Sequence, residues 1–197
     1  MNYRKSLQGV LIACGVALGG SALAATPSAQ MLGNTCAGCH GTNGSSHGPA
    51  TPTIAGISSE YFIETMQAYK DGSRPSTIMT RIAKGYTEEE IKAMAGFFAK
   101  QKFVRMDQAH DSDMAGKGAK LHKKYCEKCH EDGGRSTEDD AGILAGQWKP
   151  YLKYTMSDFM SGNREMPKKM KKKVKSLQER HGDKGLDELF DFYASQK

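Results

Sequence analysis

The sequence has little apolar material. Only 38% of its 197 residues are hydrophobic and 8% are aromatic, with a single tryptophan, and the mean hydropathy is −0.60. Its most apolar run, residues 10–23, is too short and too glycine-rich to predict a membrane span. No segment shows the strict apolar–polar alternation that is typical of strands. We therefore expect an all-α protein with a small core and no membrane span.

Cysteine is scarce too. The chain has five, and four of them lie in two C-x-x-C-H sequences, at residues 36–40 and 126–130. Two thiols three positions apart on one helical turn can reach the two vinyl groups of one haem, and the histidine that follows can then face the iron. A structural zinc site or a thioredoxin-like redox pair also uses C-x-x-C, but neither requires a histidine immediately after it. The motifs therefore predict two covalently bound haem c groups, attached at Cys36, Cys39, Cys126 and Cys129, with His40 and His130 as iron ligands.

The N-terminus has the pattern of a secretory signal. Arg4 and Lys5 precede the apolar run, and residues 22–24 form an A-x-A cleavage site. Residues 1–24 are thus expected to be a signal peptide and the mature chain to be periplasmic, where covalent haem attachment takes place in bacteria. Processing as a lipoprotein at Cys14 is the alternative. If Cys14 is removed with the signal, no thiol remains for a disulfide or for catalysis.

The chain repeats itself at an offset of 90 residues. Besides the motifs, the coincident pairs include Tyr61 with Tyr151 and Arg74 with Arg164. Such a repeat without gaps predicts a duplicated domain, with domain 1 at 25–108 and domain 2 at 109–197. Two domains of this size with so little apolar material would be marginal alone, so we expect the chain without haem to be largely unfolded.

Helix signals occur in the same order in both domains. Thr26, Ser59 and Asp113 are predicted N-caps, and Thr87 with Glu90 predicts a capping box. The expected helices are 27–36, 59–70, 76–83, 87–102, 113–126, 150–160, 167–177 and 186–195, with a linker at 104–113.

A haem iron held by one histidine needs a sixth ligand or stays open, and methionine suits electron transfer. Met79, behind a proline-containing turn and 39 residues after His40, is the candidate in domain 1. In domain 2 Met166 and Met170 compete, and we favour Met170 because its offset from Met79 is closer to the repeat period. The four remaining histidines, 47, 110, 122 and 181, lie in polar contexts and are expected at the surface.

Charge is distributed unevenly between the two domains. Domain 1 has 8 basic and 7 acidic residues, whereas domain 2 has 18 and 15, including six lysines between positions 168 and 175. No aromatic-laced basic patch predicts nucleic-acid binding. The lysine run is usually a solvated face, but it flanks Met170 and is a candidate for docking near the haem edge.

The whole mature chain resembles the two-haem cytochrome subunit of flavocytochrome c sulfide dehydrogenase. The resemblance rests on CAGCHGT (36–42), STIM (76–79), RIAKGY (81–86), GAKLH (118–122), KYCEKCH (124–130), ILAGQW (143–148) and FYASQ (192–196). It implies two class I cytochrome c folds related by a pseudo-twofold, with the ligand roles assigned above. It also implies a heterodimer with an FAD-containing subunit that oxidises sulfide, and transfer of electrons to a soluble acceptor such as a small cytochrome. In such folds a backbone carbonyl holds the haem histidine. Pro52 is placed for this in domain 1, whereas domain 2 has Gly142 at that offset.

Two other functions stay open. A free two-haem carrier that feeds a terminal oxidase would share the same tandem fold. An enzyme is the other: candidate methionine ligands on both haems oppose a two-haem peroxidase, and the lack of a spare cysteine in the mature chain opposes a thiosulfate-oxidising cytochrome with a thiolate-ligated catalytic haem. We therefore expect an electron-transfer subunit that is not itself a catalyst.

Overall fold

The computed structural model describes residues 27–137 and 141–197, and every regular element in these ranges is helical. The predicted signal peptide and Cys14 lie outside them. No helix in the described ranges is long and apolar enough to cross a membrane. The elements are α2 (Ala29–Asn34), α3 (Ala37–His40), η1 (Thr42–Gly44), α4 (Ser59–Asp71), α5 (Met79–Ile82), η2 (Ala83–Gly85), α6 (Glu88–Ala99), α7 (Ser112–Tyr125), α8 (Glu131–Gly134), α9 (Lys149–Ser161) and α10 (Lys168–Ser195).

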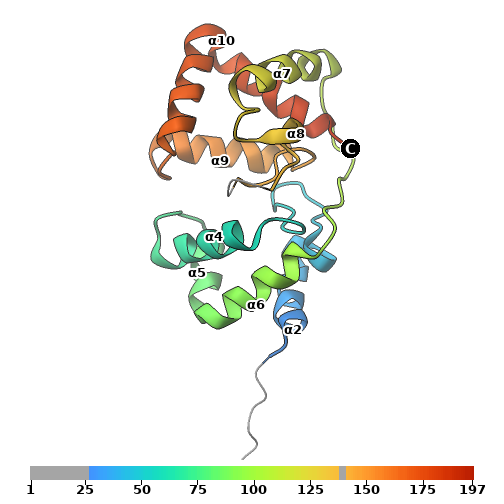
Figure 1. Cartoon of the computed structure of the whole chain (residues 1–197), viewed down its shortest axis with the longest axis vertical. Coiled ribbons are helices and arrows are strands. Elements are labelled where there is room, and N and C mark those ends of the chain that lie inside the picture. The colour runs from blue at the N-terminus through green and yellow to red at the C-terminus, as the bar shows by residue number, and fades with distance from the viewer. Residues whose placement is uncertain (1–26, 138–140) are drawn as a thin grey trace, which may run out of the picture.

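The helices form two bodies stacked along the long axis of the molecule, with α2–α6 in one and α7–α10 in the other (Figure 1). Each body has its own apolar cluster. In the first, Phe62 and Phe98 stack with ring centroids 5.5 Å apart, and Phe98 is fully buried. In the second, Leu121, Leu177 and Leu189 belong to one cluster between α7 and α10. The all-α prediction is therefore confirmed. The exact boundary at residues 108 and 109 stays a prediction.

Two helices begin one or two residues earlier than the sequence predicted. Ser58, not Ser59, is the N-cap of α4 and accepts a hydrogen bond from the amide of Tyr61. Asp111, not Asp113, is the N-cap of α7, and its carboxylate accepts hydrogen bonds from the amides of Asp113 and Met114. In both cases two residues able to cap lie close together, and only the first has the extended backbone that a cap requires.

Of the other two predicted helix starts, one begins later than predicted and one is confirmed. Ser28, rather than Thr26, is the N-cap of α2. The capping box is confirmed: the Thr87 side chain accepts from the amide of Glu90, whose carboxylate accepts from the amide of Thr87.

The last helix is broken where the sequence predicted a gap. Two helices were expected at 167–177 and 186–195, and α10 has a non-helical residue, Gly182, with φ 62° and ψ −161°. Glycine adopts this left-handed backbone without the Cβ clash of other residues. The chain therefore turns at Gly182 and packs both segments of α10 against α7.

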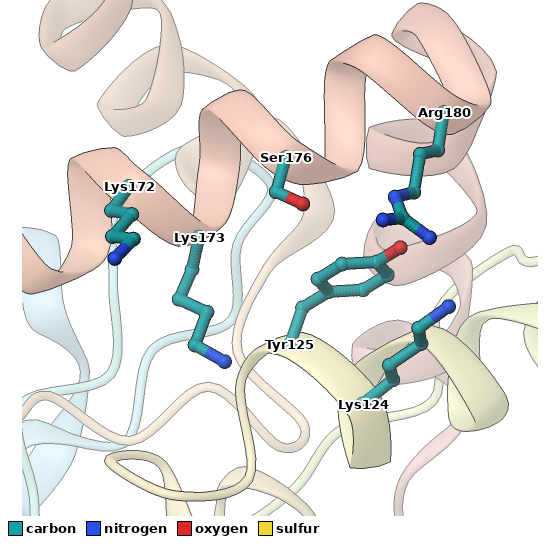
Figure 2. A pocket seen from close by; sticks show the side chains of 6 residues that line it. All are labelled: Lys124, Tyr125, Lys172, Lys173, Ser176 and Arg180. Carbon is teal, nitrogen blue, oxygen red and sulfur yellow. The ribbon is translucent and has the colours of Figure 1, made fainter.

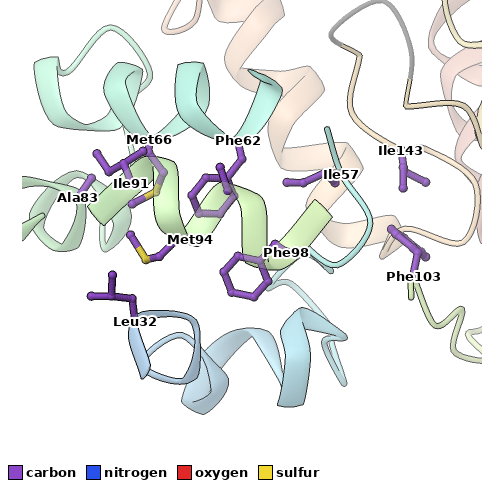
Figure 3. Packing of buried hydrophobic residues seen from close by; sticks show 11 residues of the cluster. Leu32, Ile57, Phe62, Met66, Ala83, Ile91, Met94, Phe98, Phe103 and Ile143 are labelled. Carbon is purple, nitrogen blue, oxygen red and sulfur yellow. The ribbon is translucent and has the colours of Figure 1, made fainter. Parts of the chain in front are cut away.

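Buried hydrogen bonds join the two bodies. Gln147 accepts from the amide of Thr53 through Oε1 and donates to the carbonyl of Thr53 through Nε2, both at 3.0 Å, and both residues are buried. Trp148 donates from its ring nitrogen to the carbonyl of Ser46 at 3.3 Å. Its indole ring lies against Gly48, where a Cβ would approach to 2.6 Å. Ile143 also packs beside Phe103 in the first cluster (Figure 3). These contacts fix one body against the other.

Candidate haem sites

The first C-x-x-C-H motif forms α3 and its N-cap: Cys36 caps the helix and His40 is its last residue. The amide of His40 donates to the carbonyl of Cys36 at 2.9 Å, which closes one helical turn. The ring of His40 is buried, and its Nδ1 lies 2.8 Å from the carbonyl oxygen of Pro52. Because a carbonyl only accepts, Nδ1 carries the proton and Nε2 is left as a free lone pair. The ring is thus oriented and in the tautomer that a metal ligand needs.

Met79 faces the same space from α5. The hydroxyl of Ser76 accepts from the amide of Met79 at 3.1 Å, and the amide of Ser76 donates to the Thr80 hydroxyl at 3.0 Å. These bonds fix the turn from which the methionine projects. Met79 is half-buried, packs against the first apolar cluster and lines a cavity together with His40.

The second motif follows α7, and its histidine ring lacks the hydrogen bond to a backbone carbonyl that orients the ring of His40. The amide of His130 again donates to the carbonyl of Cys126, at 3.0 Å. Within the described residues, however, the ring of His130 makes no hydrogen bond. Gly142, which aligns with Pro52 in the repeat, instead lies close to the ring of Tyr61, where a Cβ would be 3.0 Å away.

Met170, on the first turn of α10, lines the cavity beside His130, whereas Met166 is absent from the lining within the described residues. Both are half-buried. The structure thus places the favoured methionine of domain 2 at the candidate site.

Burial keeps the ligand groups uncharged. It lowers the pKa of His40 despite the hydrogen bond to Pro52, and lowers that of His130 to about 4, with His122 nearby adding to the effect. Burial also raises the pKa of Cys36, and that of Cys126 to about 11. Neutral imidazoles can bind iron, and neutral thiols are poor nucleophiles. The lowered histidine pKa values suit iron ligation, and the raised thiol pKa values do not suit thiolate catalysis.

The two sites share one continuous cavity of about 1850 Å³, which runs from the first motif across the boundary between the bodies to the second. Its walls are mostly apolar and include Phe62, Met66, Leu152 and Leu177. Drug-sized ligands occupy about 300–1,000 Å³, so the space is large enough for more than one such group. Its size and apolar walls fit two haem macrocycles.

Positive charge is buried where the two parts of the cavity meet. Arg74 is 6% exposed, donates to Tyr151 at 2.9 Å and to Thr65 at 3.1 Å, and has no carboxylate within ion-pair distance in the described residues. Burial alone would raise the pKa of Tyr61, but Arg74 and Arg164 outweigh it and lower that pKa. Two guanidinium groups beside a cavity suit a ligand that carries carboxylates, as haem does.

One of the four histidines expected at the surface is in fact buried. His122 is 2% exposed, with Nδ1 2.9 Å from the hydroxyl of Tyr193 and Nε2 2.5 Å from a carboxylate oxygen of Glu127. Burial lowers its pKa, and Glu127 opposes the effect. The ring therefore shares a hydrogen bond with Tyr193 through Nδ1, whereas Nε2 meets Glu127 as a close ion-pair contact without hydrogen-bond geometry. Neighbouring lysines made the position look exposed, but it faces α10 on the apolar side of α7.

Comparison with known proteins agrees with this geometry. Residues 25–102 match the cytochrome c family. Cytochrome c4 of Pseudomonas aeruginosa is 30% identical over 168 residues, which cover 80% of this chain and 78% of that protein. The chain belongs to the cytochrome c family. Cytochromes of this family carry haem c covalently and transfer electrons without being enzymes themselves.

Two further comparisons bear on fold and relatives. The crystal structure of reduced cytochrome c4 from Pseudomonas stutzeri superposes with a TM-score of 0.72 over 87% of this chain and 100% of that one, at 22% identity. The expected pair of class I cytochrome c domains is therefore confirmed. The cytochrome subunit of sulfide dehydrogenase from Chlorobaculum tepidum is 49% identical over 69 residues, but these cover only 35% of this cytochrome and 62% of that protein.

The residues that join the domains were not assigned a role from the sequence. Gln147 lies within the string ILAGQW, and Arg74 and Arg164 are one of the coincident pairs of the repeat. The signal in the sequence was that both domains have an arginine at the same position of the repeat. It did not show which groups meet across the boundary.

Proposed function

We propose that this cytochrome is a periplasmic electron-transfer subunit with two covalent haem c groups, which receives electrons from an FAD-containing, sulfide-oxidising partner. The observation that carries the two-haem assignment is the single cavity with a C-x-x-C-H motif and a methionine at each end. Similarity to a sulfide dehydrogenase subunit supports the choice of partner. Haem supplies reversible one-electron chemistry when it is bound.

The chain's own residues then have distinct tasks. The thiols of Cys36, Cys39, Cys126 and Cys129 attach the groups, and His40 with Met79, and His130 with Met170, hold the irons. Pro52 orients His40 through its carbonyl. Arg74 and Arg164 neutralise the carboxylates that two haems bring into the cavity, and the apolar walls exclude water. A methionine at the sixth position favours the reduced state and leaves no open site.

We assign the partner face to domain 1 and the acceptor face to domain 2. Around the domain 1 site, Ile78 is 58% exposed and Ile82 is 42% exposed, and both line the mouth of the cavity. Exposed apolar side chains suit a lasting interface. Beside Met170, the lysines of α10 suit a transient, salt-sensitive encounter with a soluble acceptor.

The test is to express the cytochrome with and without the flavoprotein and to measure sulfide-dependent haem reduction. We expect turnover only when both chains are present, together with copurification of bound FAD. Catalytic turnover by the cytochrome alone would overturn the assignment.

A second candidate is a free-standing two-haem carrier that feeds a terminal oxidase. The match to cytochrome c4 favours it, because that match extends over both domains. The same experiment separates the two: a free carrier would purify without flavin and would be reduced by several donors at similar rates.

A further inference from the structure

A small basic pocket lies on domain 2, outside the haem cavity but against its wall. It has a volume of about 240 Å³ and is lined by Lys124 and Tyr125 from α7 and by Lys172, Lys173, Ser176 and Arg180 from α10. Lys172, Ser176 and Arg180 follow one another at intervals of four residues, so they share one face of their helix. Tyr125, Lys172 and Lys173 also line the haem cavity.

Two of the basic groups meet at the tyrosine. Figure 2 shows the head groups of Lys124 and Arg180 on either side of the hydroxyl end of Tyr125, while Lys172 and Lys173 hang from α10 on the other side of the ring. The ammonium group of Lys124 lies 5.1 Å from the centre of the Tyr125 ring. The hydroxyl of Tyr125 therefore lies between two cations, and Ser176 with two further lysines completes the lining of the pocket.

No carboxylate in the described residues pairs with these four cations. The ion pairs formed there are those of His122–Glu127, Lys149–Asp191, Lys153–Asp187, Lys175–Glu179 and Lys197–Asp107. Position at the end of α7 accounts for Lys124, because a cation there interacts favourably with the helix dipole. It does not account for the three cations of α10, which repel one another and Lys124 unless an anion lies between them.

We propose that this pocket binds a small doubly charged oxyanion of the sulfate and thiosulfate class. The pocket is below the usual range for organic ligands, the lysines and Arg180 supply charge, and the hydroxyl of Ser176 supplies a neutral donor. The hydroxyl of Tyr125 already shares a hydrogen bond of 3.5 Å with the ring of His181. Because two of its lysines also form the wall of the domain 2 haem cavity, the bound anion stabilises the more positive, oxidised state of that site. The inference does not depend on which protein donates or accepts the electrons.

Thermodynamic linkage gives the size of the shift in midpoint potential that the bound anion causes. A tenfold tighter binding to the oxidised form corresponds to a potential lower by about 59 mV for one electron, so a threefold preference lowers it by about 28 mV. Binding and potential are thus two separate readouts of the same site.

The experiment titrates the purified holoprotein with sodium sulfate, at an ionic strength held constant with sodium chloride, and follows the heat of binding. The test variant is Lys124→Gln with Arg180→Gln. The control is Lys168→Gln with Lys171→Gln, which removes the same charge from the same protein at positions that line neither cavity. We expect one saturable site in the wild type, at least tenfold weaker binding in the test variant and a change below twofold in the control.

A redox titration of the same proteins supplies the second readout. Sulfate should lower the midpoint of the domain 2 site in the wild type and in the control, but not in the test variant. The proposal is wrong if sulfate gives no saturable heat beyond that of chloride, or if the control variant loses binding as much as the test variant.

Discussion

Gln147→Ala is expected to loosen the two domains and to disturb the domain 1 haem ligand. The amide of Gln147 makes both hydrogen bonds of the Thr53 backbone that cross the boundary, and both residues are about 3% exposed. Thr53 directly follows Pro52, whose carbonyl orients His40. A residue of domain 2 therefore holds the segment that positions a ligand of domain 1.

The magnitude follows from the groups left without partners. A buried donor or acceptor that loses its hydrogen bond costs about 1–3 kcal/mol. The substitution strands the N–H and the C=O of Thr53, so the free energy of unfolding should fall by about 2–6 kcal/mol, toward the lower value if water enters the vacated space. The midpoint potential of the domain 1 site should also shift, because the Pro52–His40 contact is no longer fixed.

Urea unfolding of the holoprotein and a redox titration measure the two effects. Gln101→Ala is the matched control, since Gln101 is half-buried and donates only to Phe97, four residues back in its own segment. The control should lose less than about 1 kcal/mol and keep its potentials. If Gln147→Ala costs less than about 0.5 kcal/mol and leaves both potentials unchanged, the contact does not couple the domains.

Further predictions follow from the sites. A pyridine haemochrome assay should give two haems per mature chain, and a value of one would remove one motif from the assignment. Met170→Ala should abolish one weak methionine–iron absorption band and lower one potential, whereas Met166→Ala should leave both bands; the reverse result would transfer the role to Met166. Neutralising lysines 171–173 should slow transfer to the acceptor at low salt and leave the flavoprotein bound, and loss of the flavoprotein would reverse the two faces. Folding lowers the pKa of His122 from 6.5, so below about pH 6.5 the unfolded chain binds a proton that the folded chain does not, and the free energy of unfolding should decrease there. His122→Gln should flatten this pH dependence in unfolding curves measured between pH 7 and 5.

Local signals in the sequence predicted most of the helices but shifted several boundaries. The capping box at Thr87 was unambiguous because two side chains must agree. The starts at Ser58 and Asp111 were misplaced by one or two residues, because adjacent polar residues can each cap a helix and backbone conformation decides between them. The break at Gly182 was predictable, since few other residues tolerate its backbone.

The candidate haem sites were predictable to a different degree in the two domains. The sequence paired His40 with Met79, and the two residues line one cavity. It also placed Pro52 correctly beside His40. His122 was misjudged, because the lysines around it hide the apolar side on which it lies. Burial of a polar residue depends on which helix packs against it, and composition carries no information on that.

Some residues of the repeat meet across the domain boundary, which the sequence alone did not show. Tyr61 and Tyr151 coincide at the offset of 90 residues, as do Arg74 and Arg164. In the structure Arg74 of domain 1 donates to Tyr151 of domain 2, while Arg164 of domain 2 lies close enough to Tyr61 of domain 1 to lower its pKa. Such an exchange is what a twofold relation requires, since each copy then presents the same residues to the other. Periodicity identifies equivalent residues within two domains, but only packing shows that they were duplicated to meet each other. The same two guanidinium groups lie where the two parts of the cavity join. The contact between the domains and the charge that we propose receives the haem carboxylates are therefore built from one set of side chains, so a change to either should affect both.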